Sequence, residues 1–345
     1  MEQEHKRRVR YQGTHPRNYQ EKYKELSPEK YKADVEAIIQ RGKTPAGMHL
    51  PIMVDEILDF LQIQPGQVGC DATLGYGGHT QKMLERLQGR GHLYATDVDP
   101  VESAKTRARL EGLGYGPKIL TVKRMNFARL DQVAPGVKFD FVLADLGVSS
   151  MQIDNPERGF TFKHDGPLDL RLDPTSGVTA AQRLRELDEG ELAALLEENA
   201  DEPYAEPIAR AVTQRLRRGG VVETTRELSA LIEQALSFLP AGERKQAVKK
   251  SCQRTFQALR IDVNSEFEAL YSFLDKLPGV LADGGRAAIL TFHSGEDRLV
   301  KQAFKQHLRE GVYSQVAGDV IRPSARECFQ NPRARSTKLR WAIRA

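Results

Sequence analysis

The chain has 345 residues, of which 40% are hydrophobic and 28% are charged, so it is long enough for about two domains with buried cores. It contains no run of about 18 apolar residues, which argues against a membrane span. The charged N-terminus does not resemble a secretory signal, and neither the three cysteines nor the eight histidines show the spacing of metal ligands. We therefore expect a cytoplasmic protein with reduced cysteines, no membrane span and no metal site.

The net charge of +4 is unevenly distributed along the chain. Residues 1–45 carry 11 Lys or Arg against 7 Asp or Glu, and residues 322–345 carry 7 against one, so the middle is acidic. Basic ends suit a polyanion such as RNA, and a solvated tail would carry the same charge. We interpret residues 1–45 as a basic N-terminal extension.

Between residues 46 and 150, short apolar runs alternate with patterns at helical spacing. A first helix is expected from Pro51 to the turn at Pro65–Gly66. Strands are then expected at 68–74, 92–98, 118–123 and 139–146, with helices at 78–88 and 100–112. Such alternation predicts a parallel sheet covered on both faces, in which ligands bind at the carboxyl ends of the strands.

The pattern changes between residues 151 and 250, where we predict helices and no strand. The helices are expected at 184–198, 206–218 and 225–238. From residue 251 to 345 the chain shows a helical apolar stripe over 255–276, a strand at 286–292, a helix at 295–309 and a strand at 338–343. We infer one α/β domain, formed by residues 46–150 and 251–345, that carries an inserted helical domain at 151–250.

A glycine-rich loop follows the first predicted strand, and Asp97 ends the second. Glycines permit close approach of a ligand, and the acid can accept hydrogen bonds from ribose hydroxyls. Thr80 stands where the third glycine of a dinucleotide fingerprint belongs, and Asp145 ends the fourth predicted strand. This combination favours S-adenosylmethionine over a nicotinamide dinucleotide; a tight turn with ordinary helix caps would also fit the pattern.

Nine ordered blocks of sequence carry a resemblance to a known family. They are His49–Pro51, Asp71–His79, Asp145–Ser150, Glu157–Phe160, Gly166–Asp169, Arg254–Arg260, Phe292–Ser294, Glu296–Arg298 and Asn331–Ser336. The chain resembles the bacterial small-subunit ribosomal RNA cytosine-N4 methyltransferases, the RsmH or MraW family. The resemblance implies a Rossmann-like methyltransferase domain with a helical insertion, S-adenosylmethionine as cofactor, and methylation of a cytosine N4 amine. Gly295 departs from the family, which usually has leucine there.

The resemblance also implies site residues. Cofactor contacts are expected at Gly77, Gly78, His79, Asp97, Phe127, Asp145 and Gln152. Asp145 is in addition a catalytic candidate, because it could accept an N–H hydrogen bond from the target amine; alternatively, it only orders the cofactor. His293 is a second catalytic candidate, with a structural role as the alternative.

RNA contacts are expected at Arg158, Phe160, Arg171, Arg254, Gln257, Arg260 and Asn264. Arginines bind phosphates and aromatic rings stack on unpaired bases, although Arg254 and Arg260 could instead pair with acidic residues of the insertion. The expected partner is small-subunit ribosomal RNA or the 30S particle. A homodimer is compatible with the sequence. The alternatives are a methyltransferase acting on a different RNA, a non-catalytic RNA-binding assembly factor and a nicotinamide-dependent oxidoreductase.

Overall fold

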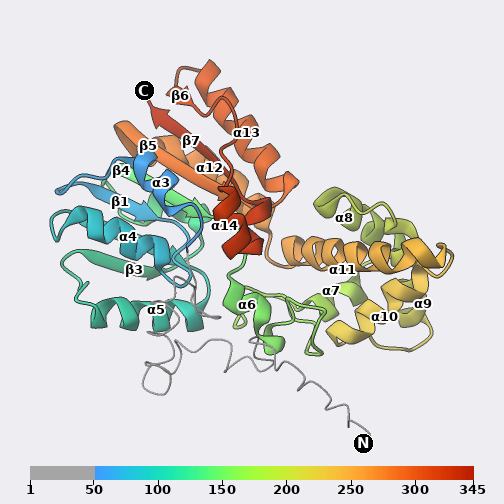
Figure 1. Ribbon diagram of the computed structural model, residues 1–345. Coiled ribbons are helices and arrows are strands. Elements are labelled where there is room, and N and C mark those ends of the chain that lie inside the picture. The colour runs from blue at the N-terminus through green and yellow to red at the C-terminus, as the bar shows by residue number, and fades with distance from the viewer. Residues whose placement is uncertain (1–50) are drawn as a thin grey trace, which may run out of the picture. The chain divides into compact units, whose positions relative to one another are not determined.

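The computed structural model describes residues 51–345, which form a seven-stranded sheet, helices that cover it and a helical insertion (Figure 1). The strands are β1 (Val68–Asp71), β2 (His92–Asp97), β3 (Leu120–Arg124), β4 (Phe139–Asp145), β5 (Leu281–Thr291), β6 (Tyr313–Val316) and β7 (Lys338–Arg344). The expected extension at residues 1–45 lies outside the described residues. Within residues 51–345, no helix is both long enough and apolar enough to cross a membrane.

The helices fall into two groups along the chain. Those around the sheet are α3 (Val54–Leu61), α4 (Gly78–Leu87), α5 (Pro100–Gly112), the 3₁₀ helix η2 (Phe127–Gln132), α12 (Glu266–Val280), α13 (Ser294–Arg309), α14 (Ala325–Gln330) and the 3₁₀ helix η4 (Pro332–Ser336). Those between β4 and α12 are α6 (Ser150–Asp154), the 3₁₀ helix η3 (Pro156–Arg158), α7 (Ala180–Glu186), α8 (Glu189–Ala200), α9 (Ala205–Arg217), α10 (Thr225–Ala235) and α11 (Ala241–Val263).

The strand order is β3-β2-β1-β4-β5-β7-β6. The first five strands are parallel, and β7 pairs antiparallel with both β5 and β6. The order reverses between β1 and β4, so the carboxyl ends of these two strands flank a topological switch point. Open α/β sheets bind ligands at such a point, which places Asp71 and Asp145 at the site where a ligand is expected.

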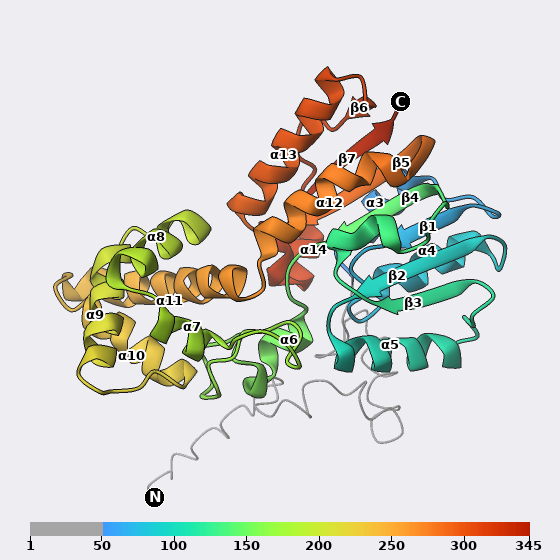
Figure 2. The ribbon, with the colours of Figure 1, turned by 180° about the vertical axis from the view of Figure 1, so that it is seen from behind.

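Successive residues of the central strands bury opposite faces of the sheet. Phe141 and Leu143 of β4 pack in a core with α3, α4 and α5, whereas Val142 and Ala144 pack against η2, α12 and α13. Figure 2 shows the face covered by η2, α12 and α13, with α12 lying over the strands. Because both faces are covered, β4 is an almost continuous apolar run, as expected of a central parallel strand.

The insertion has its own core. Buried residues of α7 to α11 form one hydrophobic cluster that also includes residues of the segment before α7, such as Phe160 and Leu170. The expected boundary at residue 250 falls inside α11, and Cys252 and Phe256 of that helix pack in this cluster. We therefore propose the turn between α11 and α12, at Asn264–Ser265, as the end of the insertion.

Two predictions about elements were wrong. The helix expected at 184–198 is two helices, α7 and α8, because the Asp188 side chain caps a new helix by accepting the Glu191 backbone N–H at 2.8 Å. The helical stripe expected at 255–276 is divided between α11 and α12, because Ser265 adopts a left-handed conformation with φ of 48°.

Gly69 provides a test of the sheet packing. It lies opposite Phe141 in the β1–β4 pairing, and a Cβ at position 69 would lie 2.1 Å from the Phe141 ring. Gly69→Ala should therefore lower the free energy of unfolding by about 1–3 kcal/mol, measured by urea denaturation. Phe141→Leu in the same chain should recover part of the loss.

Gly112→Ala is the matched control, because a Cβ at the end of α5 meets nothing within 4 Å. This variant should be neutral or stabilising by up to about 1 kcal/mol. Equal effects of the two substitutions would contradict the close packing inferred at Gly69.

Candidate cofactor and RNA site

The Asp97 carboxylate, at the end of β2, holds the glycine loop. Its Oδ2 accepts the Gly75 backbone N–H at 2.7 Å, and its Oδ1 accepts the Asp99 backbone N–H at 2.8 Å. Burial raises the pKa of Asp97 to about 6, although both hydrogen bonds favour the ionised form. Each carboxylate oxygen offers two lone-pair positions, so Asp97 can accept further hydrogen bonds from the hydroxyls of a ribose.

The glycine loop is packed tightly on its protein side. Gly77 is the N-cap of α4 with φ of 76°, and a Cβ there would lie 2.7 Å from the Thr106 side chain. A Cβ on Gly78 would lie 3.1 Å from the Pro51 ring. The Thr106 hydroxyl also donates to the Gly75 carbonyl at 2.7 Å. Glycine is therefore required at position 77 by both its backbone conformation and its neighbours.

His79 and Asp145 form a pair beside this loop. The His79 Nδ1 lies 3.4 Å from the Asp145 Oδ2, and its Nε2 lies 2.9 Å from the Ile52 carbonyl oxygen. Burial alone would lower the pKa of His79, but Asp145 outweighs burial and the pKa is raised. The paired carboxylate thus favours the protonated imidazole, which holds Asp145 in position.

The second oxygen of Asp145 is available to a ligand. Oδ1 is buried and has no hydrogen-bond partner among residues 51–345. A buried acceptor without a donor costs free energy, so an N–H group placed against Oδ1 would be bound favourably. This unpartnered atom lies at the carboxyl end of β4, at the switch point of the sheet.

Thr80 stands at the position of the third glycine of a dinucleotide fingerprint, and its side chain has a role that glycine could not fill. Its hydroxyl donates to the Asp71 Oδ2 at 2.6 Å, and both residues are buried. Burial raises the pKa of Asp71, and the bond from Thr80 partly opposes this effect. Position 80 is therefore used to satisfy the buried acid that ends β1.

Asp99 is the residue whose importance the sequence analysis missed. It is fully buried, and its Oδ1 accepts two backbone N–H groups at the start of α5. Its Oδ2 accepts Gln152 Nε2 at 2.9 Å and Arg158 Nη1 at 2.7 Å. One carboxylate thus connects the end of β2 with α6 and η3. The only sequence signal was an acid directly before Pro100, a common pattern at the start of a helix.

The predicted cofactor residues Phe127 and Gln152 lie on different elements of this region. Phe127 begins η2 and packs edge-on against Phe273, with 5.3 Å between ring centroids, and it stays partly exposed. Gln152 caps α6 together with Ser149, in addition to its bond to Asp99. Their contacts with a cofactor stay predictions.

His293 is positioned by its own helix. It is the N-cap of α13, where its Nδ1 accepts the Glu296 backbone N–H at 3.5 Å and its Nε2 lies 3.2 Å from the Glu296 carboxylate. Burial opposes ionisation of Glu296, but His293 and Arg260 outweigh burial and its pKa is lowered. This geometry supports the structural alternative for His293.

Glu266, His293 and Glu296 also form a group whose ligand atoms lie within 4.8 Å of one another, close enough for a metal ion. Glu266 is already bound bidentately by Arg260, at 2.7 and 2.8 Å. The guanidinium supplies the positive charge that a metal would otherwise provide. The expectation of no metal site stays a prediction.

A leucine could not simply replace Gly295 next to this group. A Cβ at position 295 would lie 2.7 Å from the Phe267 ring. The Phe267 ring thus occupies space that the family's leucine would need at position 295.

Five of the predicted RNA contacts already bind other parts of the chain. Arg158 is 12% exposed and pairs with Asp99, and Phe160, 9% exposed, lies in the insertion core. Arg260 pairs with Glu266 on α12 rather than with the insertion. Arg171 binds Asp169, and Asn264 bonds to the backbone of residues 170 and 172. In this geometry Arg158, Arg171 and Asn264 position the segment between α6 and α7, whereas Arg260 connects α11 with α12.

Arg254 and Gln257 differ from that group. They lie three residues apart on α11, are partly exposed, and have no ion pair or hydrogen bond with another described residue. Side chains at this spacing lie on the same face of a helix. Of the seven predicted RNA contacts, these two are the most available for a ligand.

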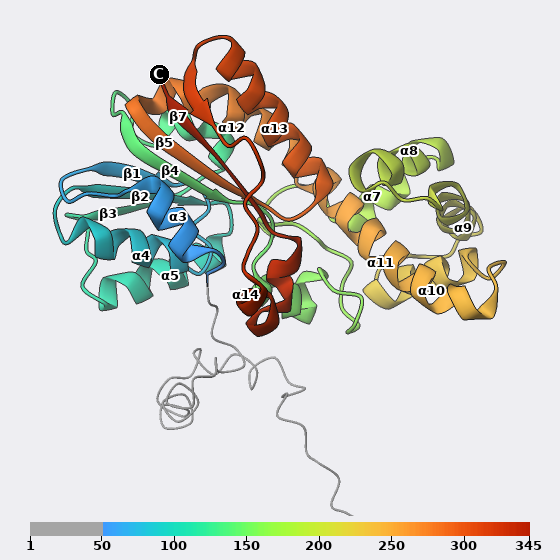
Figure 3. The same cartoon turned by 45° about the horizontal axis from the view of Figure 1, so that its top comes forward.

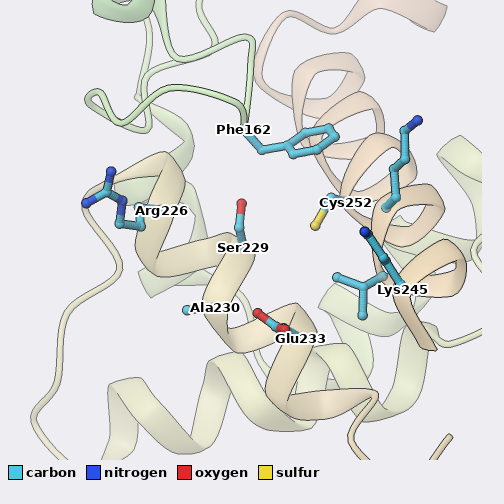
Figure 4. A pocket seen from close by; sticks show the side chains of 9 residues that line it. Phe162, Arg226, Ser229, Ala230, Glu233, Lys245 and Cys252 are labelled. Carbon is cyan, nitrogen blue, oxygen red and sulfur yellow. The ribbon is translucent and has the colours of Figure 1, made fainter. Parts of the chain in front are cut away.

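A cavity in the insertion is separate from the predicted cofactor residues. It holds about 320 Å³ and lies between the Phe162 segment, α10 and α11 (Figure 4). Its lining includes Arg226, Lys245 and Lys249 together with Cys252, and it contains none of the predicted site residues.

The Asp99–Arg158 pair yields a stability prediction. Asp99→Asn should lower the free energy of unfolding by about 3 kcal/mol, because the largely buried guanidinium would lose its carboxylate partner. Denaturant unfolding measures this change. Adding Arg158→Leu should recover part of the loss, since the uncompensated charge is then removed.

Glu111→Gln is the matched control, because Glu111 pairs with Arg107 at 3.8 Å and the two side chains are 48% and 58% exposed. Exposed pairs contribute only about 0–1 kcal/mol. Similar mild effects at positions 99 and 111 would show that Asp99 does not hold these elements together.

Comparison with known proteins identifies the family. The MraW methylase family matches residues 46–345. Ribosomal RNA small subunit methyltransferase H 1 of Lachnoclostridium phytofermentans is 63% identical over 342 residues, which cover 99% of this chain and 93% of the relative. The protein of the same name from Agathobacter rectalis is 62% identical over 345 residues, covering 100% and 99%. With this geometry and these relatives, the chain belongs to the MraW methylase family.

Proposed function

We propose that this enzyme transfers a methyl group from S-adenosylmethionine to the exocyclic N4 amine of a cytosine in small-subunit ribosomal RNA. The observation that carries the proposal is the buried, unpartnered Oδ1 of Asp145, beside the glycine loop at the switch point of the sheet. The names of the relatives supply the class of RNA. The 30S particle as the form of the substrate, and a homodimer, stay predictions.

The residues around the glycine loop fit the cofactor. Asp97 would accept hydrogen bonds from the ribose hydroxyls, and the backbone of Gly77 and Gly78 would line the site without side chains. His79 would act through Asp145, because its ring is fixed between that carboxylate and the Ile52 carbonyl. Phe127 offers a partly exposed ring to the adenine, and Gln152 would contact the cofactor from α6.

When bound, S-adenosylmethionine supplies a methyl group on a sulfonium, which is a strong electrophile. The cytosine amine is a poor nucleophile because its lone pair is conjugated with the ring, so the protein must orient it. Orientation can contribute up to about 7–11 kcal/mol in ideal cases. Asp145 Oδ1 accepts an N–H of the amine and aims the nitrogen lone pair. No strong base is needed beforehand, since the amine becomes acidic only as it is alkylated.

The target base must leave its stack to reach Asp145. The segment 146–150 follows β4 directly and would shape the pocket for the base. Arg254 and Gln257 of α11, which have no partners among the described residues, would bind the flanking nucleotides. Arg158 and Asn264 would instead keep the segment between α6 and α7 in place.

Asp145→Asn tests the catalytic role. The amide presents an N–H donor where the carboxylate accepted, so single-turnover methyl transfer at saturating cofactor should fall by about 10²–10³-fold. Transfer is measured as label passed from the methyl donor to 30S particles from a strain that lacks the modification. The dissociation constant of S-adenosylhomocysteine, from calorimetry, should change far less.

Ser294→Ala is the control, since its hydroxyl lies at the start of α13 and, within residues 51–345, bonds only to Asp201, at 3.2 Å. Its transfer rate should match that of the unaltered enzyme. An unchanged rate in Asp145→Asn would eliminate this carboxylate as the acceptor and leave it with cofactor ordering alone.

Cofactor binding should depend on pH through Asp97. Its pKa of about 6 means that the carboxylate is protonated below that pH and ionised above it. Only the ionised form accepts two ribose hydrogen bonds, so the affinity for S-adenosylhomocysteine should be about 10-fold weaker at about pH 5 than at about pH 7.

Asp97→Asn retains His79 and Asp71, whose pKa values are also raised, but lacks the acid at position 97. This variant should bind S-adenosylhomocysteine more weakly at every pH, and its affinity should no longer change steeply with pH. An Asp97→Asn profile parallel to that of the unaltered enzyme would assign the pH dependence to another group.

A further inference from the structure

Phe329 is unusual among the described apolar residues. It lies on α14 with 86% of its surface exposed, the largest exposed fraction of the large hydrophobic side chains in residues 51–345. A phenylalanine in this position contributes little to a core. A single exposed apolar side chain is common on protein surfaces, so the inference depends on the charged side chains near it.

Three arginines lie near Phe329 in the sequence. Arg326 lies three residues before it on α14, and Arg322 and Arg335 lie in the segments on either side of the helix. All three arginines are exposed, and none pairs with a carboxylate among the described residues. Glu327, the only acid of residues 322–345, is used elsewhere, because it accepts the Met53 backbone N–H at 2.7 Å.

The same contacts bring α14 close to the cofactor residues. Met53 follows Ile52, whose carbonyl holds His79. Arg333, just after α14, donates to Asp154 of α6 at 2.8 Å, and α6 also carries Gln152. Figure 3 shows α14 next to the segment that includes α6, as does Figure 1.

We propose that Phe329, Arg322, Arg326 and Arg335 form a binding site for an unpaired nucleotide of the RNA substrate, outside the catalytic pocket. The base stacks on the Phe329 ring and the arginines bind the adjoining phosphates. Stacking on an aromatic ring beside cationic side chains is the usual way in which proteins hold single-stranded RNA. Arg322, Arg326 and Arg335 are exposed and have no ion pair among the described residues, which favours a polyanion over a second apolar surface. The proposal rests on the proposed function.

The test measures binding of a fluorescein-labelled single-stranded RNA of about ten nucleotides to the full chain by fluorescence anisotropy. Phe329→Ala should weaken binding by about 5- to 150-fold, and Phe329→Trp should retain it, because the base keeps an aromatic partner. Tyr271→Ala is the matched control, since Tyr271 is also an exposed aromatic residue, at 58%, but lies on α12.

The arginines are tested through salt dependence. Replacing Arg322, Arg326 and Arg335 with Gln should reduce the slope of log Kd against log salt by about 2, whereas Phe329→Ala should leave the slope unchanged. The affinity of every variant for S-adenosylhomocysteine should stay unaltered, which also confirms that the variants fold.

The outcomes separate this site from the proposed function. If the unaltered chain methylates 30S particles but Phe329→Ala binds RNA as tightly as Tyr271→Ala, the nucleotide site is wrong and the function stands. If no methyl transfer occurs while Phe329→Ala still weakens RNA binding, the function is wrong and the site stands. Concentration-dependent self-association that Phe329→Ala abolishes, with unchanged RNA affinity, would assign the surface to a second copy of the chain.

Discussion

The site depends on one buried negative charge. Asp99 has no exposed surface, yet it accepts hydrogen bonds from the backbone of α5, from Gln152 and from Arg158. Breaking such a pair leaves a charge without a partner in a poorly hydrated place, which is far costlier than losing a surface pair. The end of β2, α6 and the first segment of the insertion are therefore fixed to one another, and the residues they carry keep a defined geometry.

Acidic groups gather at the carboxyl ends of the parallel strands because the strands end at the same edge. Asp71, Asp97 and Asp99 are each satisfied by hydrogen bonds from within the protein. Asp145 is different, because His79 binds one of its oxygens and the other has no partner among the described residues. The fold thus uses Asp71 and Asp99 to shape the edge of the sheet, whereas Asp97 holds the glycine loop and keeps lone pairs for a ribose, and Asp145 Oδ1 is left as an acceptor for the target amine.

Features that depend on a short stretch of sequence could be predicted. The glycine loop, Asp97 and Asp145 could be predicted because they lie at the ends of apolar runs that indicate strands. The predicted strands differ from the observed ones by a few residues. The break between α7 and α8 could also have been found, from Asp188 and Glu191 in a capping box. What could not be predicted is pairing across the fold: Arg158 and Asp99 are 59 residues apart in sequence, and nothing local distinguishes a buried arginine from one that binds RNA.

That distinction decides how the positive charge of the chain can be used. Arginines such as Arg158 and Arg260 are neutralised by acids inside the fold and gain stability from them, so RNA would have to break those pairs before it could bind there. Arg254 on α11 and Arg326 on α14 have no such competitor among the described residues. An incoming phosphate therefore gains the full interaction at free side chains such as these. The net charge of +4 thus says little about where RNA is attracted, because the position of the unpaired positive charges decides that.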